Sequence, residues 1–173
     1  MDAIALLREQ LATSRDFLHG TLADVTADDA RASPPGATNS IAATYAHLLI
    51  GEDGFINGLL RGHPPLAATD WAGKMGLSEQ PPQGPDWNEW GKRVRVDLNA
   101  LRAYDDAVAA STDAFLASLV PADLARTIDL SAFGFGERPL SWVLSAGVVG
   151  HLSAHWGEIC ALKGLRGGKG FPV

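Results

Sequence analysis

The chain is poor in cysteine and in positive charge. Cys160 is its only cysteine among 173 residues, which excludes an internal disulfide and a multi-cysteine zinc site. Lysine and arginine together number 14 against 20 aspartates and glutamates, so the net charge is −6 at pH 7. Because nucleic acids and anionic membranes attract clustered positive charge, we expect no nucleic acid and no membrane among the partners.

Targeting and nucleotide-binding patterns are also missing. The first ten residues lack the basic start and the apolar run of a secretory signal. The most apolar stretch, residues 142–162, contains His151, His155 and Glu158, each of which would be costly inside a bilayer. There is no P-loop, no glycine fingerprint for a dinucleotide and no Gly-x-Ser-x-Gly elbow. We therefore expect a cytoplasmic protein.

The residues that are present suit a helical core. Hydrophobic residues make up 46% of the chain and charged residues 20%, which excludes a disordered chain. At this length we predict one domain that spans residues 1–173. Apolar residues recur at helical spacing in four segments. These segments are residues 2–25, 41–60, 86–119 and 141–164.

The connections between these segments are long. Residues 61–85 are rich in glycine and proline and have no clear period, and residues 127–140 predict either a small hairpin or an irregular crossover. A glycine-rich tail begins at about residue 164, and we expect it to be mobile. Four long helices with little strand predict an all-α four-helix bundle, and the long connections argue against a simple up-down-up-down order.

His151 and His155 are four residues apart on the last predicted helix. Residues at this spacing share a helix face, and imidazoles so placed can bind one metal ion. The same face carries the apolar residues Leu144, Val148, Ile159 and Leu162. Inward-facing imidazoles need a partner, because a buried polar group without one is costly. The pair alone leaves two interpretations open, a metal site and histidines bonded to backbone or water.

His47 lies within the second predicted helix. Its neighbours on the same face form a stripe of small residues: Ala43, Thr44, Gly51, Gly54 and Gly58. Such a stripe allows either the close approach of another helix or space for a ligand. His47 could complete a three-histidine site with His151 and His155, and three imidazoles with an open position are typical of a catalytic zinc or related site. His19 and His63 are expected to be exposed to solvent.

Two stretches of the sequence carry a family resemblance. The loop Pro-Pro-Gly-Ala-Thr-Asn-Ser-Ile at residues 34–41 precedes the helix of His47, and His-Leu-Ser-Ala-His-Trp-Gly-Glu-Ile follows far downstream at residues 151–159. In these two regions and in the order of its elements, the chain resembles the DinB/YfiT-like superfamily. The name of that family refers to induction by DNA damage and does not imply DNA binding.

The resemblance implies a fold, a metal site and a class of reaction. The fold is a four-helix bundle with up-down-down-up connectivity and long crossover connections. Similar proteins bind one divalent metal ion, often nickel or zinc, through three histidines that match His47, His151 and His155. Some of them are S-transferases or isomerases that depend on a low-molecular-weight thiol, mycothiol or bacillithiol, and homodimers are common among them.

Glu158 departs from the family pattern, which usually has Gln at this position. On a helix Glu158 lies about 20° from His151, so it shares the metal face. There it could hold an imidazole in place or act as an acid or base. The alternative is a glutamate at the helix end that reaches solvent or pairs with Lys163 or Arg166.

Other reactive or aromatic residues have simpler interpretations. Cys160 lies opposite His151 on the helix wheel, so we expect it to pack in the interior. Glu52 and Asp53 lie off the face of His47, so we expect both in solvent. Three tryptophans in or after the long loop could line the mouth of a pocket, form a subunit contact or pack the loop. They are Trp71, Trp87 and Trp90.

The sequence thus favours a metal-dependent enzyme that acts on a small molecule. The resemblance adds thiol-dependent transfer or isomerisation, although no thiol-binding motif is visible in the residues. The alternatives are a protein that binds a metal ion or a small molecule without turnover, and a metal-dependent hydrolase.

Overall fold

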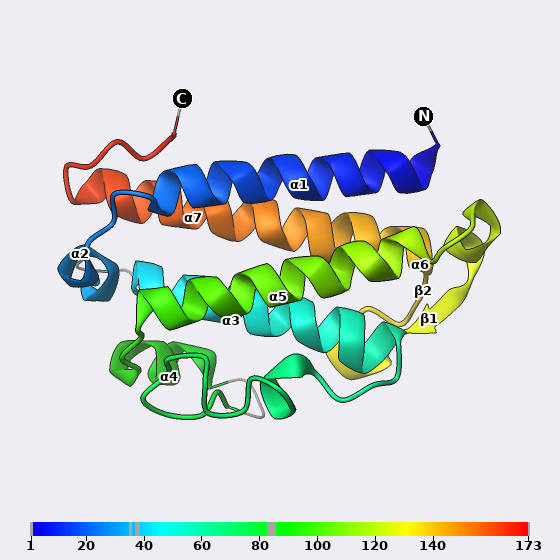
Figure 1. The fold of residues 1–173 in the computed structure, drawn as a ribbon, viewed down its shortest axis with the longest axis horizontal. Helices are drawn as coiled ribbons and strands as arrows, with labels where there is room; N and C mark the ends of the chain where they lie inside the picture. The colour runs from blue at the N-terminus through cyan, green and yellow to red at the C-terminus, as the bar shows by residue number, and fades with distance from the viewer. Residues whose placement is uncertain (1, 35, 37–38, 83–85, 173) are drawn as a thin grey trace.

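The computed structural model describes residues 2–34, 36, 39–82 and 86–172. Four long helical segments form a bundle (Figure 1). They are α1 (Ala3–Leu22), α3 (Ile41–Asp53) continued by the π-helical segment η1 (Gly54–Leu60), α5 (Leu98–Ala117), and α7 (His151–Leu165) preceded by α6 (Leu140–Trp142) and the π-helical segment η5 (Val143–Gly150). The predicted all-α bundle is confirmed.

The helices run in the order up, down, down, up. Figure 1 shows α1 and α7 running in one direction and α3 and α5 in the other. Because α3 and α5 are parallel, the chain between them must return along the whole bundle. This return takes in the predicted long connection and holds two short helices, η2 (Leu66–Ala68) and α4 (Trp87–Arg93). Residues 83–85 of the connection lie outside the described residues.

The core lies where the apolar stripes of the four long segments meet. The stripe predicted on the first helix is buried as expected, with Leu7, Leu11 and Leu18 among its members. Around the bundle, α1 contacts α7, α7 contacts α3, α3 contacts α5, and α5 contacts α1. Ser40 caps α3 as a side-chain acceptor for the amide of Ala43. Pro35, Ala37 and Thr38 of the preceding loop lie outside the described residues.

Two helix boundaries differ from the prediction. The first helix ends at Leu22, and a short helix α2 (Ala27–Arg31) follows, capped by the Thr26 hydroxyl. The predicted helix over residues 86–119 is divided into α4 and α5. Asp97 causes this division, because its carboxylate accepts the amides of Asn99 and Ala100 and so caps a new helix.

A small hairpin joins α5 to α6. It is one of the two alternatives predicted for residues 127–140, the other being an irregular crossover. Its strands are β1 (Thr127–Asp129) and β2 (Glu137–Pro139), paired antiparallel with Thr127 opposite Pro139. The 3-10 turn η3 (Pro121–Ala125) precedes the hairpin, and a second 3-10 turn, η4 (Ser131–Phe133), lies between its strands. Phe133 packs against Phe55 of η1, so the hairpin covers the end of the bundle.

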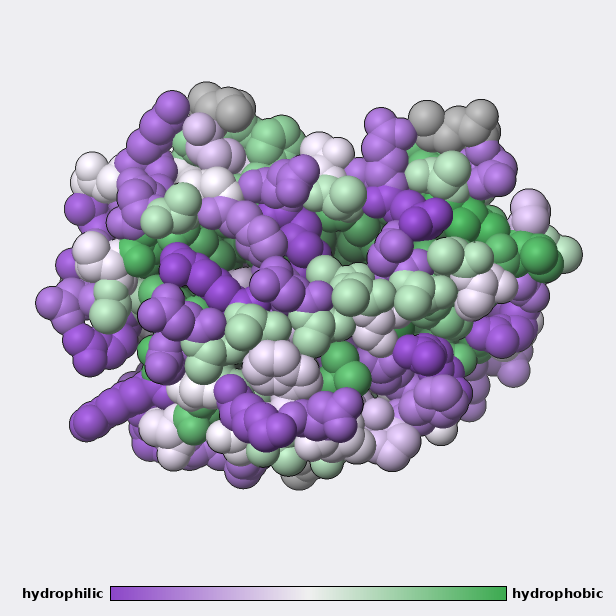
Figure 2. Space-filling view, viewed as in Figure 1, coloured by the Kyte–Doolittle hydropathy of each residue, from purple (hydrophilic) through white to green (hydrophobic). Residues whose placement is uncertain are grey.

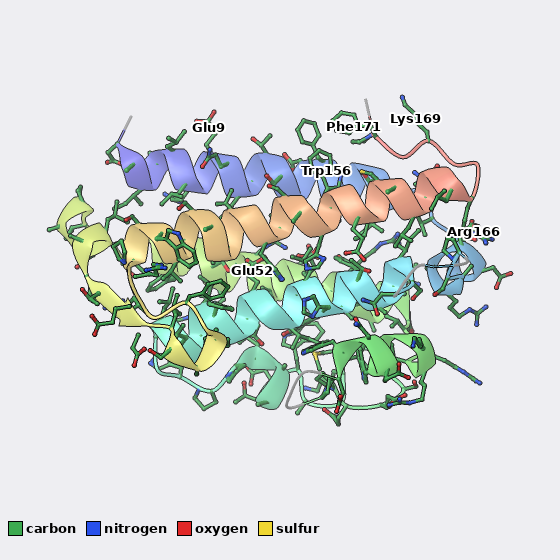
Figure 3. All side chains as sticks on the ribbon, turned by 180° about the vertical axis from the view of Figure 1, so that it is seen from behind. Glu9, Glu52, Trp156, Arg166, Lys169 and Phe171 are labelled. Atoms are coloured by element: carbon green, nitrogen blue, oxygen red, sulfur yellow. The ribbon has the colours of Figure 1, made fainter. Side chains whose placement is uncertain are left out.

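The glycine-rich tail turns back along the bundle. Helix α7 continues to Leu165, and Phe171 then packs against Phe17 and Trp156, between α1 and α7. Figure 3, seen from behind, shows Phe171 and Trp156 close together there. The predicted mobility of this tail stays a prediction, although its described residues make these specific contacts. Within the described part of the chain, no helix combines the length and the apolar character needed to cross a membrane.

Candidate metal centre

Three histidines converge between α3 and α7. His47 comes from α3, while His151 and His155 come from the first two turns of α7. Each offers one ligand atom, and these atoms lie within 4.8 Å of one another. The ring centroids are 5.3 Å apart for His47 and His151, 4.9 Å for His47 and His155, and 4.5 Å for the pair on α7. Such a triangle brings three nitrogen donors close enough to share one divalent ion.

Gly51 makes room for this arrangement. It lies one turn after His47 on α3. A Cβ atom at this position would lie only 3.1 Å from Cε1 of His151, which is tighter than side chains normally pack. The predicted small-residue stripe therefore brings the two helices close and, at Gly51, leaves space for an imidazole.

A π-helical segment leads directly into the two histidines of α7. Segment η5 ends at Gly150, and His151 begins the α-helix. Leu144 and Val148 of this segment are buried, as the apolar stripe predicted. Extended π-helical turns are rare and are frequent at functional sites. The spacing of apolar residues does not distinguish π-helical from α-helical turns, so this feature could not be predicted from the sequence.

Glu158 orients one of the three imidazoles. Its Oε2 lies 2.8 Å from Nδ1 of His155. Because a carboxylate can only accept, Nδ1 carries the proton and Nε2 keeps a lone pair for a metal ion. The other carboxylate oxygen accepts from the Thr44 hydroxyl at 3.4 Å. This arrangement matches the carboxylate–histidine pairs that hold metal ligands in known sites.

The alternative partners of Glu158 are engaged elsewhere. Lys163 donates to the carbonyl of Thr21 and to Asp24, and Arg166 donates to Asp29. The Glu158 side chain is 38% exposed and the His155 side chain 24%, so the site is accessible from solvent on this side. Of the alternative left open for Glu158, the pairing with Lys163 or Arg166 is not formed, while its side chain does reach solvent.

The surroundings keep two of the imidazoles neutral. Burial, with the nearby His155 and His47, lowers the pKa of His151 to about 4. Burial and the nearby His155 also lower the pKa of His47, although Glu158 opposes the shift. Both rings are thus uncharged at neutral pH, which is the state that can ligate a metal ion.

His47 differs from His155 in how it is held. Its Nδ1 is buried and has no hydrogen-bond partner within the described ranges. Its ring instead meets the indole of Trp87 edge-on, at a centroid distance of 4.5 Å and an interplanar angle of 75°. An unpaired buried nitrogen costs about 1–3 kcal/mol, so a site with an unsatisfied ring nitrogen is suited to a bound ion.

The remaining histidines lie outside the centre. His63 is exposed, as expected. His19 is also exposed, but its Nε2 lies 2.7 Å from Asp105 of α5. This bond raises the pKa of His19, although burial opposes it. Cys160 is half-buried against α1, its sulfur 3.7 Å from the Thr21 hydroxyl, and it does not join the three histidines.

The expectation that Glu52 and Asp53 lie in solvent is wrong. Their exposed fractions are 3% and 0%. Both oxygens of Glu52 accept from Arg15 at 2.7 Å, and one accepts from Thr112 at 2.6 Å. Figure 3 shows Glu52 lying between the helices. The partners come from α1 and α5, so the burial could not be read from α3 alone.

Asp53 has a different set of partners. It accepts from Tyr104 at 2.6 Å and from Asn57 at 2.7 Å. It also accepts the backbone amides of Leu66 and Ala67 at 2.9 and 2.8 Å. A carboxylate that satisfies these donors can be buried, and it ties the start of the crossover to α3.

Comparisons with known proteins bear on the fold and the family. Residues 10–159 match a family model described as the DinB superfamily. No curated protein matches the chain. A solved crystal structure, described as a conserved protein from Enterococcus faecalis, is similar with a TM-score of 0.81 and 21% identity. The match covers 95% of this chain and 97% of that one, and at this identity it concerns the fold alone.

Proposed function

The chain belongs to the DinB superfamily, and on that premise we propose that it is a metal-dependent enzyme acting on a small molecule. In this proposal His47, His151 and His155 hold one divalent ion, and the reaction is a thiol-dependent transfer or isomerisation. The convergence of three nitrogen donors from two helices within 4.8 Å is the observation that carries it.

The donor set favours particular metals. Three imidazoles suit zinc and nickel better than magnesium or calcium, which prefer oxygen ligands. The half-buried rings of His47 and His151 are neutral at pH 7, and Glu158 holds the ring of His155, so all three rings favour metal binding. We therefore propose zinc or nickel as the cofactor.

The residues around the centre define the chemistry. A divalent ion held by the three imidazoles would supply a Lewis acid to a bound small molecule. Glu158 holds the proton at Nδ1 of His155 and keeps that ring in one tautomer. Thr44 in turn donates to Glu158, and Gly51 leaves the His151 ring its place. These residues hold the imidazoles in place for the ion. A small substrate would enter at the exposed side of His155.

Metal analysis of the purified protein tests the binding step. The wild type is expected to carry or take up one equivalent of zinc or nickel, and replacement of any one of the three histidines by Ala should lower this stoichiometry sharply. His63→Ala is the matched control, because His63 is exposed and lies outside the centre. Equal metal content in the wild type and all three variants would contradict the site.

A substrate screen tests the catalytic step. The metal-loaded protein is incubated with a low-molecular-weight thiol and small electrophiles, and the loss of free thiol is measured. Turnover that disappears in His151→Ala supports a transferase. Stoichiometric metal binding without turnover would instead support a protein that binds the metal alone, and thiol-independent hydrolysis would support a hydrolase.

A further inference from the structure

The three imidazoles of the centre are held by three different devices. Glu158 holds His155 through a hydrogen bond, and the space above Gly51 accepts the ring of His151. For His47 the described residues offer Nδ1 no hydrogen bond, and the indole of Trp87 is its close aromatic neighbour outside the triad. The direction of the His47 ring therefore depends on an aromatic contact.

Trp87 does not belong to the bundle helices. It is the first residue of α4, which lies in the crossover between α3 and α5. Its indole is half-buried and meets Trp90 edge-on at 5.3 Å. A residue far along the chain from all three histidines thus reaches the centre because the parallel arrangement of α3 and α5 returns the crossover along the bundle.

Helix α4 is firmly seated against α3. Trp90 is 2% exposed. A Cβ atom at Gly91 would clash with the Asn39 side chain and lie 3.4 Å from Cβ of Ala43, so α4 approaches α3 closely at this glycine. At the end of α4, the backbone of Arg95 accepts from the amide of Ser78 at 2.9 Å, which ties α4 to the earlier part of the crossover. The indole of Trp87 is therefore presented to His47 from a fixed support.

We propose that Trp87 is a positioning residue of the metal centre, which sets the direction of the His47 imidazole through its ring and makes α4 part of the site. This inference rests on the proposed function. Trp87 takes for His47 the role that Glu158 takes for His155. Losing an aromatic contact of this kind should lower the metal affinity by about 2–10-fold.

Nickel titration with tryptophan fluorescence tests the role in metal binding. Nickel quenches nearby indoles, so Trp87 should supply the largest share of the quenching. Trp87→Phe keeps a ring against His47 and should lose that share while its affinity stays near that of the wild type. Trp87→Ala should bind nickel about 2–10-fold more weakly, as measured by competition with a chelator.

Trp71→Phe is the control. The ring of Trp71 packs against Tyr104 of α5 at 5.6 Å, so this variant should retain both the quenching and the affinity. Trp87→Ala with wild-type affinity would overturn the positioning role. Full quenching in Trp87→Phe would overturn the placement of Trp87 beside the ion.

A measurement without metal separates the two possible failures. In the metal-free protein the indole should shift the His47 ring protons through its ring current, and Trp87→Ala should abolish this shift in the histidine NMR spectrum. Circular dichroism confirms that the variant is folded. An unchanged His47 signal would overturn the contact, whatever the metal content. A lost shift in a protein that takes up no nickel would instead overturn the metal centre and, with it, the role of Trp87.

Discussion

A carboxylate three residues after a histidine on one helix can reach back to its imidazole, and Glu158 does so with His155. The sequence placed Glu158 on the face of the two histidines but left its partner open. In the structure Glu158 bonds to His155, while Lys163 and Arg166 bond to Asp24 and Asp29 instead. The role of Glu158 as a positioning carboxylate could thus be anticipated from spacing, and its partner could not.

Glu158→Gln should weaken metal binding by about 10–100-fold without unfolding the protein. The neutral amide accepts the proton of His155 Nδ1 less strongly than a carboxylate, so the ring loses part of its orientation and basicity. Isothermal titration with zinc measures the change. Glu89→Gln is the control, since Glu89 is exposed and its carboxylate pairs with Lys92, away from the three histidines. Unchanged affinity in Glu158→Gln would return Glu158 to an ordinary surface charge.

The packing of α3 on α7 determines the space available to the imidazoles. Gly51→Ala would place a methyl group 3.1 Å from Cε1 of His151 and push that ring from its position. We expect metal affinity to fall by about tenfold, although Ala favours a helix over Gly by about 1 kcal/mol.

Gly54→Ala is the matched control for this change. A Cβ atom at Gly54 meets no atom within 4 Å, and its φ of −61° is helical. The control gains the same helix propensity and should keep the wild-type affinity. Thermal unfolding and zinc titration on both variants separate the two effects. Equal affinities in the two variants would contradict the role given to Gly51.

Arg15 links three helices through buried charges. It comes from α1 and donates to Glu52 of α3 and to Asp105 of α5. Arg15→Ala leaves both carboxylates buried without their cation, and we expect the free energy of unfolding to fall by about 3–5 kcal/mol. Urea denaturation measures the loss. Arg8→Ala should leave the free energy of unfolding nearly unchanged, because the Arg8–Asp113 pair is exposed and screened by solvent.

Periodicity predicted the helices better than their interruptions. The apolar stripes located the four long segments, and the helix predicted over residues 41–60 has those bounds when α3 and η1 are taken together. The division at residues 94–97 depends on the cap formed by Asp97, which the apolar pattern does not reveal. The burial of Glu52 and Asp53 depends on partners from other helices, so it required the tertiary structure.

The topology of the whole molecule explains how the crossover reaches the centre. Parallel neighbours such as α3 and α5 cannot be joined by a short turn, so the chain between them runs back past α3 (Figure 1). That path brings α4 beside α3 and Trp87 beside His47. The sequence left three roles open for this tryptophan, and its contact with His47 follows only from the path of the chain.

The outer face of α5 bears on the homodimer that the family resemblance leads us to expect. Figure 2 shows weakly apolar surface over this helix, where the exposed residues include Ala103, Ala110, Ala114 and Ala117. Small side chains at this spacing allow a second helix to approach closely. We expect light scattering at micromolar concentration to give twice the chain mass of 18.2 kDa. A mass of one chain would contradict the dimer.

Two histidines should give the stability of the metal-free protein opposite dependences on pH. The bond to Asp105 raises the pKa of His19, so its contribution is complete below about pH 6.5 and is lost as pH rises through the folded pKa. Burial and the neighbouring imidazoles lower the pKa of His151 to about 4, so its contribution is present above about pH 6.5 and is lost as pH falls toward that value.

Replacing His19 isolates the first of these effects. His19→Gln removes the group that gains a proton beside Asp105, so the stability difference from the wild type should be largest near about pH 5.5 and should shrink by about pH 9. Urea denaturation across this range, with metal removed by a chelator, measures the difference. His63→Gln should match the wild type throughout, because His63 is exposed. A stability difference for His19→Gln that does not change with pH would contradict the prediction. The bond to Asp105 would then stabilise the fold whether or not His19 is protonated.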